Sequence, residues 1–222
     1  MLDVSPIAQT EPPLDCPLCP RLVALRHQCQ LQHPDWWNAP VPAFGDAKAW
    51  LGIVGLAPGM MGANRTGRPF TGDYAGDLLF ATLAKFGLSC GTYDARIDDG
   101  LALAGVIIIN SVKCLPPQNK PTPQEINTCR RFLTAQLEAL PQLRVFIALG
   151  RIAHDSFLRH LGLRAASFPF GHNARHDVGG GRVLIDSYHC SRYNTNTGRL
   201  TAAMFEAVFA QAMGERDPDR PA

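Results

Sequence analysis

Apolar runs typical of buried strands alternate along the chain with amphipathic runs typical of helices. The strand-like runs, rich in β-branched residues, cover residues 49–56, 105–112, 144–149 and 182–187. The helical patterns cover residues 74–87, 123–140, 151–161 and 200–213. Because parallel strands need a crossover segment between them, this alternation predicts an α/β fold. We expect a three-layer α/β/α arrangement around a central, mostly parallel four-stranded sheet.

Two local features refine this expectation. Thr122 precedes Pro123 and Glu125, which predicts a helix capped by the threonine with proline in its first turn. Polar or glycine-rich loops follow the strand-like runs that end near Leu56, Val112 and residue 187. Ligands of parallel sheets bind at the carboxyl ends of the strands, so we expect these three loops to meet at one rim.

Length and composition fit a single globular domain over residues 14–213, with flexible segments at 1–13 and 214–222. The net charge of +2 does not by itself indicate a nucleic-acid binder, but basic residues gather in segment 113–131. The chain opens without a secretory signal, and its longest apolar run, 101–109, is too short to span a membrane. We therefore expect a cytoplasmic protein without a membrane partner, and a monomer.

Four of the seven cysteines have the spacing of metal ligands. Cys16 and Cys19 form one pair, and Cys114 and Cys129 form a second. Four thiolates suffice for a metal site, and spacing alone leaves open tetrahedral zinc, a [4Fe–4S] cluster, or unconnected buried cysteines. The other cysteines have no partner at ligand spacing, so we expect free thiols at Cys29, Cys90 and Cys190.

Three motifs, taken with the cysteines, resemble the uracil-DNA glycosylase superfamily, specifically its iron–sulfur branch and most closely the type B (family 5) enzymes. The first motif comprises Gly-Leu-Ala-Pro-Gly at 55–59 and Asn-Arg-Thr-Gly-Arg-Pro-Phe-Thr-Gly-Asp at 64–73. The second is Asn-Ser-Val-Lys-Cys-Leu-Pro-Pro at 110–117, followed by Asn-Lys-Pro-Thr-Pro at 119–123. The third is Tyr-His-Cys-Ser at 188–191 with Asn-Thr-Asn-Thr-Gly-Arg-Leu-Thr at 194–201. The similarity runs from Cys16 to about Phe209.

The resemblance implies a monofunctional DNA glycosylase of base-excision repair. Such an enzyme flips uracil out of DNA and hydrolyses its N-glycosidic bond. The type B resemblance also implies tolerance for other deaminated bases such as hypoxanthine. It further implies a structural [4Fe–4S] cluster on the four cysteines, with zinc in the same four-cysteine site as the lesser alternative.

Each motif can be given a task in that reaction. A donor nitrogen of His189 could hydrogen-bond a uracil carbonyl as charge develops on the leaving base. The amide of Asn110 suits the imide edge of uracil, and Phe70 would stack on the ring. Asp73 is the candidate for water activation, and Leu56 and Ala57 would also line the base pocket. Read singly, these residues fit a surface histidine, a turn-capping asparagine, a core phenylalanine and a helix-capping aspartate.

The remaining polar residues of the motifs are candidates for contacts with the DNA backbone. They are Arg65, Arg68, Lys113, Lys120, Ser191, Arg192, Tyr193, Asn194, Asn196 and Arg199. Tyr193 occupies the position where relatives carry a wedge that fills the space left by the flipped base. Lys113 could also suggest a Schiff-base lyase, but we expect a phosphate contact. Most relatives read His-Pro-Ser in the third motif, and Cys190 in place of proline predicts a freer wedge loop.

Two other functions fit part of the sequence. A non-catalytic, metal-stapled nucleic-acid-binding module would explain the cysteines and the basic loops, but not Asn110 at the end of a strand together with His189. A phosphate-binding hydrolase would need a cluster of metal-binding carboxylates or a phosphate-binding loop ending in Lys-Ser/Thr, and the sequence has neither.

Overall fold

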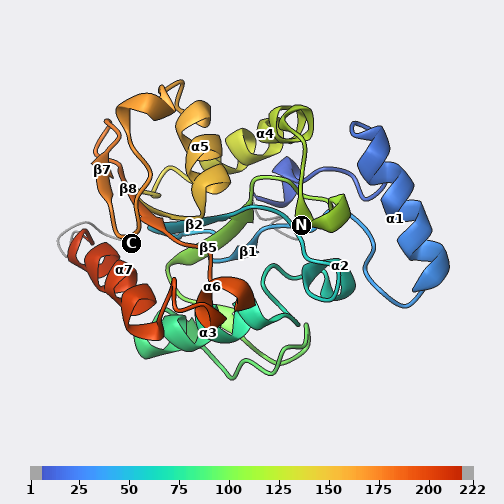
Figure 1. Ribbon diagram of the computed structural model, residues 1–222, viewed down its shortest axis with the longest axis horizontal. Coiled ribbons are helices and arrows are strands. Elements are labelled where there is room, and N and C mark those ends of the chain that lie inside the picture. Colours follow the sequence, from blue (N-terminus) through green and yellow to red (C-terminus); the bar gives the residue numbers. More distant parts are fainter. Residues whose placement is uncertain (1–6, 217–222) are drawn as a thin grey trace, which may run out of the picture.

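The computed structural model describes residues 7–216 and has a central mixed sheet between two layers of helices (Figure 1). Within these residues the sheet has six strands in the order β1-β5-β2-β6-β8-β7. Their bounds are β1 Phe44–Gly45, β2 Leu51–Gly55, β5 Val106–Asn110, β6 Val145–Leu149, β7 Arg175–Asp177 and β8 Val183–Ser187. The four inner strands are parallel, and β1 and β7 pair antiparallel at the edges.

The expected α/β/α architecture is confirmed, but the expected number of four strands is wrong. The missing strands β1 and β7 are only two and three residues long and carry no fully buried residue. Such short edge strands lack the apolar run by which a buried strand is recognised in a sequence. A separate two-stranded hairpin, β3 Ser89–Cys90 with β4 Ala102–Leu103, was likewise not expected.

The helices divide between the two faces of the sheet. In Figure 1, α3 (Tyr74–Lys85) and α7 (Ala202–Gly214) cover one face, and α4 (Pro123–Glu138) and α5 (Arg151–His160) cover the other. The smaller helices are α1 Pro20–Gln32, α2 Ala63–Thr66 and α6 Arg192–Asn196, with 3-10 turns at Ala8–Thr10, Pro117–Asn119 and Ala165–Ser167. None of these smaller elements was expected from the apolar pattern. In the part of the chain that is described, no helix is both long and apolar enough to cross a bilayer.

The inner strands are buried on both faces, which explains their nearly continuous apolar sequences. In β2, Leu51 and Ile53 face the core beneath α3 and α7, whereas Val54 faces the core beneath α4 and α5. Each such side chain, once fully buried, contributes about 1.5–3 kcal/mol to folding. The two cores therefore hold the carboxyl ends of the parallel strands at one edge.

The start of α4 confirms the expected cap. The Thr122 side chain accepts a hydrogen bond from the Glu125 backbone N–H, and the Glu125 carboxylate accepts one from the Thr122 N–H at 2.7 Å. The same carboxylate accepts two hydrogen bonds from Arg21, at 2.8 and 2.7 Å. This capping box therefore also fastens α1 to α4.

The two chain ends are only partly covered by the description. The terminal segments expected to be flexible include residues 1–6 and 217–222, which lie outside the described residues. Residues 7–13 pack against the domain, because Ile7 belongs to a core cluster and the Glu11 carboxylate accepts a hydrogen bond from the Ala43 N–H at 2.7 Å. At the other end, α7 continues to Gly214.

Candidate active site and metal centre

Three loops that are distant in sequence meet at the carboxyl edge of the sheet and line a cleft of about 770 Å³. The cleft brings together the residues expected to bind the base and carry the reaction: Leu56, Ala57, Phe70, Asp73, Asn110 and His189. The convergence predicted from the strand–loop pattern is therefore present. The cleft lies where ligands bind in parallel sheets.

Asn110 ends β5 and lies beside Gly55, the last residue of β2, in the parallel ladder. A Cβ atom on Gly55 would lie 2.3 Å from Asn110 Oδ1, so only glycine leaves room for this amide. The neighbouring Ser111 binds the Gly55 carbonyl through both its N–H and its hydroxyl, each at 2.9 Å. Asn110 is only 3% exposed, and its Oδ1 has no hydrogen-bond partner within residues 7–216. A buried acceptor without a partner is costly, which suggests that a ligand supplies the donor.

Phe70 has a φ of 55°, a backbone conformation that is strained for an aromatic residue. Its carbonyl oxygen accepts a hydrogen bond from the Tyr93 hydroxyl at 3.3 Å and packs tightly against Gly76, where an added Cβ would lie 1.8 Å away. These contacts turn the largely buried ring into the cleft, with its centroid 6.0 Å from that of His189. The strain therefore serves to place an aromatic face in the site.

His189 follows β8 by two residues and is held by its backbone, because Asn194 Nδ2 donates a hydrogen bond to its carbonyl at 2.8 Å. Burial lowers the pKa of His189 to about 4. The imidazole is therefore neutral at physiological pH, so one ring nitrogen carries a proton and can donate a hydrogen bond to a ligand in the cleft.

Asp73 is the N-cap of α3, and its Oδ1 accepts a hydrogen bond from the Gly76 N–H at 3.3 Å. The other oxygen, Oδ2, faces the loop at Gly59 and Gly62, where added Cβ atoms would lie 3.3 and 2.3 Å from it. Burial raises the pKa of Asp73, although hydrogen bonds from Gly76 and Ala75 oppose the shift. The helix-capping role is thus present, and it leaves one carboxylate oxygen uncommitted beside the cleft.

The residues expected to contact DNA divide into surface and interior positions. Six lie exposed on the surface: Arg65, Lys120, Arg192, Tyr193, Asn196 and Arg199. Tyr193 is 72% exposed, as a wedge residue would need to be. Ser191 caps α6 and also lines the cleft. The Asn194 amide is committed to the His189 carbonyl and so positions the loop.

Arg68 and Lys113 are corrections to the expected DNA contacts, because both are buried. The Arg68 guanidinium forms a two-fold ion pair with Asp99, at 2.8 and 2.6 Å, and holds the pKa of that carboxyl well below its usual value. The Lys113 ammonium donates to Gln136 Oε1 inside the domain. Neither cation can reach a phosphate, so both serve the fold.

Cys190, at the position where most relatives have proline, packs inside the domain, and the freer wedge loop stays a prediction. Its side chain is fully buried, and its Sγ donates a weak hydrogen bond to the Ala75 carbonyl at 3.4 Å. Ala75 lies in the first turn of α3, two residues after the Asp73 cap. The thiol therefore tethers the loop that carries His189 to the helix that carries Asp73.

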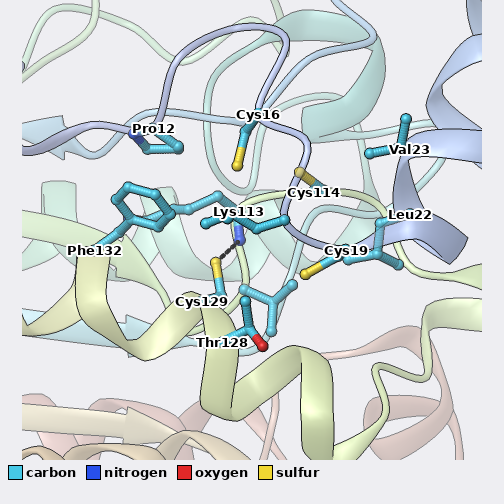
Figure 2. A pocket seen from close by; sticks show the side chains of 12 residues that line it. Pro12, Cys16, Cys19, Leu22, Val23, Lys113, Cys114, Thr128, Cys129 and Phe132 are labelled. Carbon is cyan, nitrogen blue, oxygen red and sulfur yellow. Dashed lines mark hydrogen bonds between the residues drawn. The ribbon is translucent and has the colours of Figure 1, made fainter.

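The four cysteines expected to bind metal come together at the start of α1 and along α4. Figure 2 shows the sulfur atoms of Cys16, Cys19, Cys114 and Cys129 facing a common space. Their surroundings are apolar, formed by Leu22, Val112, Ile126 and Phe132. Burial raises the pKa of Cys114 to about 12 and that of Cys129 to about 11, so these thiols need a bound cation to ionise at neutral pH.

The spacing of these sulfurs is wider than a single tetrahedral ion requires. Zinc–sulfur bonds of about 2.3 Å place the four sulfurs about 3.8 Å apart. Among residues 7–216, no three of the four sulfurs all lie within 4.8 Å of one another. Thiol side chains can rotate toward a bound ion, so this donor set fits zinc as well as an iron–sulfur cluster.

A second cluster, His154, His176 and Asp186, does bring three ligand-type atoms within 4.8 Å. Both ring nitrogens of His154 are already engaged, Nδ1 with Asp186 Oδ1 at 2.6 Å and Nε2 with the Phe168 carbonyl at 2.9 Å. The other Asp186 oxygen contacts His176 Nε2 at 3.0 Å. The cluster therefore works as a buried hydrogen-bond network that joins α5, β8 and the 168–176 segment.

Sequence reasoning missed several residues that line the cleft, namely Met61, Tyr74, Asp77, Ala95 and Asn119. Tyr74 and Asp77 follow Asp73 on the first turn of α3 and could have been found from that placement. Ala95 belongs to a loop that reaches the cleft only through tertiary packing, and no local pattern marks it.

The fold and this site together define a class of protein. A family model described as "Uracil DNA glycosylase superfamily" matches residues 42–212, and the chain belongs to this superfamily. More particularly, it is similar to a type-5 uracil-DNA glycosylase of Thermus thermophilus, with 48% identity over 202 residues, covering 89% of this chain and 92% of that protein. A type-5 uracil-DNA glycosylase of Pyrobaculum aerophilum is 40% identical over 206 residues, covering 91% and 89%. A type-4 uracil-DNA glycosylase of Archaeoglobus fulgidus is 41% identical over 114 residues, about half of each chain (51% and 49%).

Proposed function

We propose that this protein is a monofunctional DNA glycosylase of base-excision repair that flips uracil out of DNA and hydrolyses its N-glycosidic bond. The observation that carries the proposal is the unpartnered Oδ1 of Asn110, buried at the carboxyl edge of the sheet. Uracil offers an imide N–H beside a carbonyl, and a primary amide can accept from the first and donate to the second. The family and the named relatives support the same activity.

The chemistry requires stabilisation of a base that leaves with negative charge. The neutral imidazole of His189 can donate a hydrogen bond to a uracil carbonyl, and that bond strengthens as the charge develops. Because burial holds the pKa of His189 near 4, the imidazole is neutral and donates through the one ring nitrogen that carries a proton. The Phe70 ring, turned into the cleft by its strained backbone, offers a face on which the extruded base can stack.

The sugar left behind has oxocarbenium character and must be attacked by water. The Oδ2 atom of Asp73 is the carboxylate oxygen that helix capping leaves uncommitted, and it can orient or deprotonate that water. A raised pKa brings the carboxylate closer to the basicity that a general base needs. The alternative is that Asp73 only caps α3, and substitutions at this position distinguish the two roles.

The same recognition extends to other bases. Hypoxanthine also presents an N–H beside a carbonyl, and a cleft of about 770 Å³ has space for a purine. We therefore propose that hypoxanthine is a second substrate. A panel of single-lesion oligonucleotides, compared by kcat/KM, tests this extension separately from uracil excision.

The four cysteines supply the donor set of a [4Fe–4S] cluster, which the resemblance to the iron–sulfur branch implies, and zinc is the lesser alternative. Cys16, Cys19, Cys114 and Cys129 would hold the cluster, which would link the segment before α1 to α4. When bound, it supplies structural cross-linking and the positive charge that keeps buried thiols ionised. None of the four cysteines lines the cleft, although Ala57 of the cleft packs against their cluster, and no reaction step depends on the metal group.

Lys113 gives the Schiff-base alternative no support. A lyase needs an amine that reaches the sugar, and this ammonium is 1% exposed and bound to Gln136. We therefore propose simple hydrolysis, without strand cleavage by the enzyme. Incubation with uracil-containing duplex should give abasic sites that break only after alkali.

The decisive experiment measures alkali-labile product from a uracil duplex with wild-type protein, Asn110→Ala and His189→Ala. Each variant should slow excision by about 100-fold or more, and circular dichroism should show an intact fold. Absence of abasic product from any deaminated base would favour the metal-stapled binding module. For the metal, absorbance near about 400 nm with bound iron supports the cluster, and a colourless protein with bound zinc contradicts it.

A further inference from the structure

A second concavity of about 550 Å³ lies beside the cleft and is lined by residues 35–37, Arg65, Thr66 and residues 95–98. We call it the tryptophan groove. Trp37 is 37% exposed and Ile97 is 59% exposed. Apolar side chains of this size, gathered in a concave surface and left accessible, indicate a binding site.

The groove has rigid walls. The Trp37 indole packs over Gly67, where an added Cβ would lie 2.8 Å from the ring, and its N–H donates to the Pro40 carbonyl at 3.0 Å. Trp36 stacks on His33, with ring centroids 3.9 Å apart and an angle of 8° between the planes. The indole planes are thus held in fixed orientations, which favours the stacking of a flat ligand.

The loop of residues 95–98 also lines the groove, and the ion pair of the buried Arg68 with Asp99 anchors this loop. Asp99 also accepts backbone hydrogen bonds from Asp94 at 3.1 Å and Leu101 at 3.0 Å, so one carboxylate fixes the loop that carries Ala95 to Asp98. Ala95 has a φ of 55° and lines both the groove and the cleft. The groove therefore adjoins the proposed active site, and Ala95 is the residue that the two concavities share.

The charges favour a neutral ring over a phosphate within the groove. Arg96 is paired with Asp98, at 2.9 and 2.7 Å, and Asp35 adds a negative charge. Arg65 is an exposed cation at the same groove, and its Nε donates to the carbonyl of Met61, which lines the cleft. Arg65 could therefore bind a phosphate where the strand passes from one concavity to the other.

We propose that the tryptophan groove binds an unpaired base of the substrate strand, a neighbour of the nucleotide held in the cleft, by stacking. The proposal rests on the proposed function, because it assumes that DNA occupies the cleft. Stacking in the groove should therefore add to the affinity that the cleft alone gives for single-stranded or locally melted DNA. Stacking on aromatic side chains accepts any base, so this subsite would add affinity without sequence preference.

The test compares Trp36→Ala and Ile97→Ser with Leu31→Ser, a control at an exposed position (86%) that does not line the groove. The substrate is a short single-stranded oligonucleotide with one uracil and 2-aminopurine on its 5′ or 3′ side. Trp36→Ala should raise KM by about tenfold and Ile97→Ser by about threefold, each with loss of 2-aminopurine quenching. The control should match the wild-type protein.

Unchanged KM and unchanged quenching in both groove variants would overturn the inference while leaving uracil excision established. If the wild-type protein excises no uracil, the affinity of the groove is measured separately. Quenching of tryptophan emission on titration with uracil-free single strands then gives the Kd of each variant. A weaker Kd in the groove variants, with an unchanged salt slope, then supports stacking. An equal Kd overturns it.

Discussion

Gly55 and Asn110 lie directly opposite each other at the ends of two parallel strands, and the missing side chain of the first makes room for the amide of the second. An added Cβ would lie 2.3 Å from Asn110 Oδ1 and 3.1 Å from the Phe70 ring. One glycine thus makes room for both of the groups that we propose contact the base.

Gly55→Ala should therefore lower kcat/KM for uracil excision by about 100-fold, because a shift of about 1 Å in a positioned group costs that much. Overpacking should cost about 1–3 kcal/mol in the free energy of unfolding. Gly214→Ala, at the end of α7 with no atom within 4 Å of the added carbon, is the matched control. Full activity in Gly55→Ala would show that the amide does not need this position.

Substitutions at Asp73 separate its two roles. Asn keeps an oxygen that can cap α3 but cannot take a proton from water, whereas Ala removes both functions. We expect Asp73→Asn to lose excision with a nearly unchanged melting temperature. Asp73→Ala should lose excision and also about 1 kcal/mol of stability. An excision rate near wild type in Asp73→Asn would show that Asp73 only caps α3.

The pH dependence of His189 follows from its burial. Its pKa of about 4 means that excision should show no inflection near pH 6.5, the ordinary histidine value. The unfolded chain takes up this proton near pH 6.5, but the folded chain does so only near pH 4. The contribution of His189 to stability should therefore decline as pH falls between these values. NMR titration measures the pKa of the imidazole. Unfolding free energies of the wild-type protein and His189→Gln, compared across pH, measure the effect on stability. An imidazole that titrates at the ordinary histidine value would contradict both expectations.

The buried Asp186 predicts a large effect on stability. Its carboxylate contacts ring nitrogens of His154 and His176 and accepts from the Gly171 N–H. Asp186→Ala leaves these groups buried without their partner, so we expect a loss of about 3–5 kcal/mol in denaturant unfolding. Glu206→Ala, which breaks the exposed Lys85 pair, should cost less than about 1 kcal/mol. Similar losses in the two variants would show that the network contributes little.

Much of this architecture could be predicted from local patterns. Apolar, β-branched runs mark the four inner strands because both faces of those strands are buried. The Thr122–Glu125 spacing marks the start of α4 because the capping box forms within one turn. The order of strands and loops also indicates that Asn110 and His189 share one edge, since parallel strands end on the same side.

Other features depend on partners that are distant in sequence. Arg68 and Lys113 look like surface cations, but Asp99 and Gln136, 31 and 23 residues away, draw them into the interior. Cys190 in place of proline suggests a freer loop, and the sequence does not reveal its contact with Ala75, 115 residues away. By itself, the sequence determined which segments become buried strands and helices, because that choice follows from periodicity within each segment. Only the tertiary structure decided which polar side chains remain free for a ligand, because that depends on whether folding brings a charged or hydrogen-bonding partner within reach.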